Sequence, residues 1–112
     1  QNAGLPLASV GQWTVHELNR RRDDPQVQVL DVRAPEEVGQ GRVPGARHAF
    51  VAHLPEGLDQ LDKDRTVATY CGSGYRASIA ASILKRHGFS RVVNVPGSWI
   101  AWRKDDLPVA ER

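Results

Sequence analysis

The stretch that decides the fold is TVATYCGSGYRASIAASILKRHG, residues 66–88. Its first five residues form a short run rich in β-branched side chains, which is typical of a buried strand. A glycine-containing loop follows, and from Arg76 the pattern turns helical, with Gly88 as the expected C-terminal cap. The apolar face of this helix is expected to comprise Ile79, Ala80, Ile83, Leu84 and His87. The sequence therefore predicts a strand, a tight loop and a helix in direct succession.

The alternation of strands and helices extends in both directions from this stretch. Thr14 and Glu17 have the spacing of a capping box, which predicts a helix that fades before Pro25. A further helix is expected to open at Pro35. We expect strands at 27–32 and 91–95, a loop at 39–48, and helices at 54–64 and 96–107. Strands that are apolar on both faces and separated by helices predict an α/β fold, an open parallel sheet covered by helices on both faces.

Composition limits the classes of function. A chain of 112 residues with 40% hydrophobic and 25% charged residues fits one globular domain, and no membrane-spanning segment is expected. The net charge is only +2, and the basic run at 20–22 is followed at once by two aspartates, so nucleic-acid binding is not expected. The four histidines lack paired metal-ligand spacing, and we expect no metal and no cofactor.

The chain has a single cysteine, Cys71, at the predicted carboxyl end of the central strand. Ligands of open α/β folds bind beyond such strand ends. Gly72 and Gly74 allow the backbone to turn N–H groups inward, and the following helix N-terminus and Arg76 add positive charge, which together favour a thiolate. The alternative is a small buried side chain without chemistry. A lone thiol suits a reducing compartment, so a cytoplasmic location is expected.

Four segments together resemble the rhodanese-homology family: LDVRAPEEV, GRVPGARH, YCGSGYRAS and VVNVPGSWIAW. The resemblance extends over about residues 10–107. It implies a five-stranded parallel sheet flanked by helices, with 1–112 as one rhodanese-like domain and 1–9 as a linker or flexible N-terminus. It also implies sulfur transfer through a cysteine persulfide.

By position, the resemblance implies that Cys71 accepts the sulfur and that Asp31 and Arg33 lie near the site and hold neighbouring loops. The substrate-binding residues of the Cys71 loop, residues 71–76, are then Gly72, Ser73, Gly74, Tyr75 and Arg76. Its C-x4-R spacing is one residue shorter than the C-x5-R of cysteine phosphatases. The shorter loop favours sulfur transfer, while arsenate reductase or phosphatase activity is a less favoured alternative.

The expected reactants are a small anionic sulfur donor such as thiosulfate and an acceptor that is cyanide or a thiol. Mercaptopyruvate is a secondary donor candidate. An alternative function is a sulfur-relay or regulatory module that serves a fused or partner enzyme, such as a persulfide-oxidising metalloenzyme.

Two residues depart from the family pattern. Arg42 stands where the loop usually has histidine, and we expect it to be an exposed loop charge. Ser98 stands where the last segment usually has its second glycine, and we expect it to cap the final helix.

Overall fold

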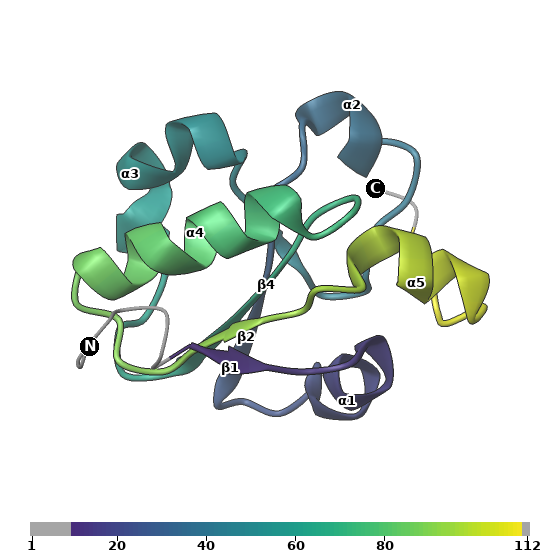
Figure 1. Ribbon diagram of the computed structural model, residues 1–112, viewed down its shortest axis with the longest axis horizontal. Helices are drawn as coiled ribbons and strands as arrows, with labels where there is room; N and C mark the ends of the chain where they lie inside the picture. Colours follow the sequence, from purple (N-terminus) through teal and green to yellow (C-terminus); the bar gives the residue numbers. More distant parts are fainter. Residues whose placement is uncertain (1–9, 111–112) are drawn as a thin grey trace.

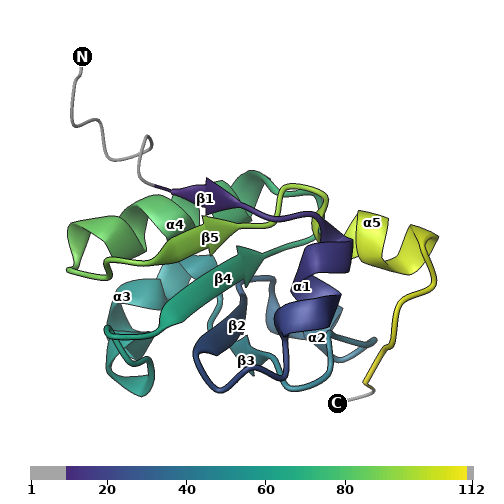
Figure 2. The same ribbon diagram turned by 90° about the horizontal axis from the view of Figure 1, so that it is seen from below.

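A computed structural model describes residues 10–110, so the expected linker at 1–9 lies outside the described residues (Figure 1). Five parallel strands form one sheet in the order β1-β5-β4-β2-β3, which can be followed across Figure 2. The strands are β1 (Gly11–Gln12), β2 (Val27–Asp31), β3 (Arg47–His48), β4 (Thr66–Tyr70) and β5 (Val92–Asn94). The predicted open parallel sheet is confirmed, and β4 lies at its centre.

Helices cover both faces of the sheet, as predicted (Figure 1). The helical elements are α1 (Val15–Arg21), α2 (Pro35–Val38), η2 (Val51–His53), α3 (Leu54–Gly57), η3 (Leu58–Gln60), α4 (Tyr75–Arg86) and α5 (Ser98–Lys104). One buried cluster joins α3 and α4 to the sheet, and a second joins α1 and α5 to its other face. Within residues 10–110, no helix is long and apolar enough to cross a membrane.

The predicted strand, loop and helix of residues 66–88 are present as β4, the Cys71 loop and α4. The face of α4 differs from the expected one, because its fully buried residues are Ala77, Ala80, Ala81 and Leu84. Ile79 is 39% exposed and His87 is exposed. Small alanine side chains let the helix axis approach the sheet closely, so the alanines rather than the larger isoleucine set the orientation.

Three further expectations need correction. The single helix expected at 54–64 is shorter and divided into α3 and η3, with η2 directly before it, because Gly57 weakens the helix and Leu61 is extended. The loop expected at 39–48 contains β3 at its end, where two residues pair with the edge of β2. Strand β1 was not predicted, since two exposed residues carry no apolar pattern.

Candidate active site

The Cys71 loop begins at the carboxyl end of the central strand and ends in the first turn of α4. Its sharpest turn is at Gly74, which has φ +103° and precedes the first residue of α4. A Cβ atom at this position would overlap the Pro96 carbonyl oxygen. Positive φ and this close approach together require glycine, so the loop geometry is a direct consequence of the sequence.

The side chain of Cys71 is fully buried, and two backbone N–H groups point at its sulfur. Gly74 N lies 3.0 Å from Sγ and Ala77 N lies 3.3 Å from it. Both donors belong to the amino-terminal end of α4, where unpaired N–H groups and the helix dipole favour negative charge. The arrangement can stabilise a thiolate or an anionic persulfide.

The remaining loop residues are placed differently from one another. Ser73 and Tyr75 are exposed, Tyr75 by 74%, while the Gly72 carbonyl accepts a hydrogen bond from Ile100 N at 3.0 Å. Of the five expected substrate-binding residues, Gly74 donates its backbone N–H to Sγ, and the Arg76 guanidinium interacts with the Cys71 side chain, which adds to the rise in the pKa of Arg76 caused mainly by Glu37. The expected cradle is therefore built from the turn and the helix start rather than from the whole loop.

Ser98 does not cap α5, which is a correction to the sequence expectation. Gly97 takes the capping position, and Ser98 has φ +54° with its side chain turned inward. Its hydroxyl oxygen accepts a hydrogen bond from Cys71 N at 3.1 Å and donates to the Val95 carbonyl at 2.7 Å. The buried hydroxyl thus holds the backbone of Cys71 against the turn that follows β5.

Arg76 forms a bidentate ion pair with Glu37 of α2. The distances are 2.6 Å from Nη1 to Oε1 and 3.0 Å from Nη2 to Oε2. Hydrogen bonding to Arg76 lowers the pKa of Glu37 from 4.5 to about 2, and hydrogen bonding to Glu37 raises the pKa of Arg76. The pair lies against Gly72, where an added Cβ would be 3.0 Å from Arg76 Nη2. The cation of the loop is therefore already balanced by a carboxylate.

Asp31 and Arg33 form a buried ion pair at the carboxyl end of β2, beside the site. Nη2 of Arg33 binds Asp31 Oδ2 and the Gly41 carbonyl, both at 2.8 Å. The Tyr70 hydroxyl donates to Asp31 Oδ2 at 2.7 Å and accepts from Val43 N at 3.1 Å. Burial raises the pKa of Tyr70, and the charge of Asp31 adds to that rise. This network ties the end of β2, the end of β4 and the loop at 39–48 together.

Arg42 is half-buried rather than an exposed loop charge, which is a second correction. Its backbone N and O both pair with Ala110, at 2.9 and 2.8 Å. These two hydrogen bonds hold the backbone of Arg42 against Ala110, the last described residue, which partly covers Arg42.

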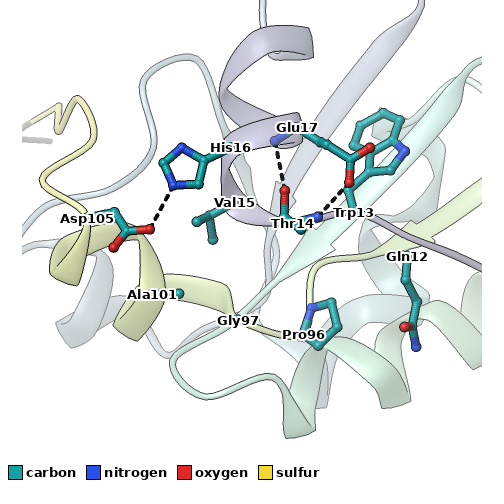
Figure 3. A pocket seen from close by; sticks show the side chains of 10 residues that line it. All are labelled: Gln12, Trp13, Thr14, Val15, His16, Glu17, Pro96, Gly97, Ala101 and Asp105. Carbon is teal, nitrogen blue, oxygen red and sulfur yellow. Dashed lines mark hydrogen bonds and ion pairs between the residues drawn. The ribbon is translucent and has the colours of Figure 1, made fainter.

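Two of the cavities near this end of the sheet have walls that contact the Cys71 loop. One, of about 510 Å³, lies between α1, the Pro96–Gly97 turn and α5, and His16 pairs with Asp105 at 2.8 Å on its wall (Figure 3). Cys71 lines neither this cavity nor the second one. The other, of about 280 Å³, is bounded by Glu37 and Trp99, which also contact the Cys71 loop. The first cavity meets the loop at Pro96, which lies against Gly74, whereas the second meets it at two residues, Glu37 and Trp99.

A comparison with protein-family models matches residues 14–105 to the rhodanese-like domain. The chain belongs to the rhodanese-like family. Similar proteins include a sulfurtransferase of Allochromatium vinosum, 37% identical over 80% of this chain and 84% of that protein. A putative sulfurtransferase of Bacillus subtilis, YtwF, is 36% identical over 76% of this chain and 82% of the length of YtwF. A crystal structure of a rhodanese-related protein from Thermoplasma volcanium has a TM-score of 0.82, with 25% identity over 91% of this chain and 99% of that one.

Three residues of this rhodanese-like site were not assigned to it from the sequence: Glu37, Ala77 and Ser98. The approach of Glu37 to Arg76 depends on α2 lying near the first turn of α4, and nothing local in the sequence indicates it. Ala77 contributes only a backbone N–H, which residue type does not report. One feature of the sequence could have indicated the unusual backbone of Ser98. It stands where the family usually has glycine, and glycine is common at positions with positive φ, which Ser98 takes here.

Proposed function

We propose that this rhodanese-like domain is a sulfurtransferase that moves a sulfane sulfur from thiosulfate or a related donor to a thiol or cyanide through a Cys71 persulfide. The observation that carries the proposal is the pair of N–H groups 3.0 and 3.3 Å from Sγ. The names of similar proteins, which include sulfurtransferases, support the same class of reaction.

In the first half-reaction, the Cys71 thiolate attacks the outer sulfur of thiosulfate. A bond forms between Sγ and that sulfur, the sulfur–sulfur bond of the donor breaks, and its electron pair leaves with sulfite. The product is Cys71 persulfide, which carries one negative charge on the outer sulfur. The N–H groups of Gly74 and Ala77 point at Sγ, the inner sulfur of the persulfide, and offset part of its negative charge without reorganisation.

In the second half-reaction, an acceptor thiolate or cyanide attacks the outer sulfur of the persulfide. The bond to Sγ breaks, its electron pair returns to Cys71, and the acceptor leaves as a persulfide or as thiocyanate. The same two N–H groups then stabilise the regenerated thiolate. Each half-reaction transfers sulfur without a separate oxidant.

The test is the intact mass of the protein after incubation with thiosulfate, combined with a sulfite assay. We expect the wild-type protein to gain one sulfur atom and release one equivalent of sulfite, and Cys71→Ser to do neither. If thiosulfate, mercaptopyruvate and small persulfides all leave Cys71 unmodified, the proposal is wrong.

A second candidate is a sulfur relay that exchanges sulfur with another protein. Two large apolar side chains near the loop favour it, since Tyr75 is 74% exposed and Ile100, whose N–H binds Gly72, is 63% exposed. Exposed apolar groups of this size are suited to a protein contact. Faster sulfur transfer with a protein persulfide than with thiosulfate, and its loss in Ile100→Ser, would favour the relay.

A further inference from the structure

The cavity of about 280 Å³ shares two walls with the Cys71 loop. Glu37 lines the cavity and binds Arg76, while Trp99 lines it and donates its backbone N–H to the Cys71 carbonyl at 2.8 Å. The complete lining is Arg33, Glu36, Glu37, Gln40, Trp99 and Arg103. A molecule bound in this cavity therefore contacts two residues, Glu37 and Trp99, that are hydrogen-bonded directly to the Cys71 loop.

The charges of the lining are balanced between two cations and two carboxylates. Arg33 is already paired with Asp31, and Glu37 is already paired with Arg76. Among residues 10–110, neither Glu36 nor Arg103 takes part in an ion pair, and both are exposed. The two charges left for a ligand are thus one anion and one cation.

The ring of Trp99 supplies an apolar surface in the same cavity. The Arg33 guanidinium lies 4.5 Å from the ring centroid and that of Arg103 lies 5.9 Å from it. A ligand that contacts Arg103 thus lies close to the indole, which suits a short aliphatic stem. A dianion would find only one cation without a partner here, whereas a zwitterion would find a counter-charge for each end.

We propose that this cavity binds the sulfur acceptor of the reaction and that the acceptor is an α-amino-acid thiol, with its carboxylate on Arg103 and its ammonium on Glu36. This inference rests on the proposed function and names its acceptor class. The acceptor thiol loses its proton to water, and its thiolate attacks the outer sulfur of the Cys71 persulfide. The carbon-bound sulfur then carries the transferred atom as a persulfide, and Cys71 regains its thiolate.

The first test uses four acceptors with protein that has been persulfidated beforehand. L-cysteine has both charged groups, cysteamine lacks the carboxylate, 3-mercaptopropionate lacks the ammonium, and 2-mercaptoethanol lacks both. Rates are expressed per thiolate, so that differences in thiol acidity cancel. We expect kcat/KM for L-cysteine to exceed that for 2-mercaptoethanol by about tenfold or more, the value of one charged hydrogen bond.

Two variants test whether Arg103 binds the carboxylate of the acceptor and Glu36 its ammonium. Arg103→Gln is expected to reduce the preference for L-cysteine over cysteamine about tenfold, and Glu36→Gln to reduce the preference for L-cysteine over 3-mercaptopropionate by a similar factor. The matched control is Arg86→Gln, an exposed arginine in the last turn of α4, at the end opposite the Cys71 loop. Equal preferences in the wild type and in both cavity variants would overturn the assignment.

A binding experiment separates this inference from the proposed function. S-methyl-L-cysteine cannot accept sulfur, and its binding is followed by the NMR signal of the Trp99 indole N–H. We expect a saturable shift in Cys71→Ser that weakens about tenfold in the double variant with Glu36→Gln. A shift without persulfide formation in the wild type would refute the proposed function but retain the site. No shift of Trp99 would overturn the site even if Cys71 accepts sulfur.

Discussion

Replacing Ser98 tests how the site is held, because this residue combines two buried hydrogen bonds with a left-handed backbone. Ser98→Ala removes the acceptor of Cys71 N–H and the donor to the Val95 carbonyl, and the side chain at this position is only 1% exposed. A buried group left without its partner costs about 1–3 kcal/mol. We therefore expect Ser98→Ala to lower the free energy of unfolding by about 2–4 kcal/mol.

Ser98→Gly loses the same two hydrogen bonds but relieves the backbone. At φ +54°, a residue with a Cβ is less favourable than glycine by about 1 kcal/mol. The glycine variant should consequently be about 1 kcal/mol more stable than the alanine variant, although both are less stable than the wild type.

Urea denaturation followed by circular dichroism gives the free energy of unfolding of the wild type, Ser98→Ala and Ser98→Gly. The rate of Cys71 persulfidation in native buffer provides the functional readout, and we expect it to fall in both variants because the Cys71 backbone loses a contact. The reasoning is refuted if Ser98→Ala lies within about 0.5 kcal/mol of the wild type, or if glycine is no better than alanine at this position.

Three other changes test the loop and its supports. Glu37→Gln should cost about 1 kcal/mol near neutral pH, since the ion pair is partly exposed; because the Glu37 pKa is lowered to about 2, this difference should be full above pH 4.5 and vanish as the pH approaches 2 in urea titrations. Gly74→Ala adds a Cβ against Pro96 at positive φ and should cost more than about 2 kcal/mol, whereas Gly88→Ala, at φ +92° with only ordinary contact to the Lys63 side chain, should cost about 1 kcal/mol in the same assay. Equal losses for the two glycines would contradict the overlap. Tyr70→Phe removes a hydroxyl with two buried partners and should lower the thermal midpoint by the equivalent of about 1–3 kcal/mol; an unchanged midpoint would show that the network contributes little.

The parts of the fold that could be predicted are those specified by neighbouring residues. Strand β4 follows a β-branched run, and the Thr14–Glu17 capping box is present at the start of α1. Positive φ at Gly74 and Gly88 is allowed by the absence of a side chain, although Gly72, where the same was expected, does not take it. These features were predictable because local sterics and periodicity decide them.

The parts that could not be predicted depend on contacts between distant segments. The buried face of α4 is set by how closely its alanines approach the sheet, which the apolar pattern alone does not report. The Glu37–Arg76 pair joins residues 39 positions apart, and the Ser98–Cys71 bond joins residues 27 apart. The position of the nucleophile candidate was therefore predictable, but the groups that hold and balance it were not.

The enclosure of the only sulfur in the chain makes thiol labelling a direct measure of loop motion. Since Cys71 is fully buried and no other residue carries a thiol, every alkylation event reports one opening of one loop. Small reagents and bulky reagents should then react at rates that differ by the extent of opening each requires. Comparing those rates with and without a sulfur donor would show whether the donor enters through spontaneous openings or opens the loop itself.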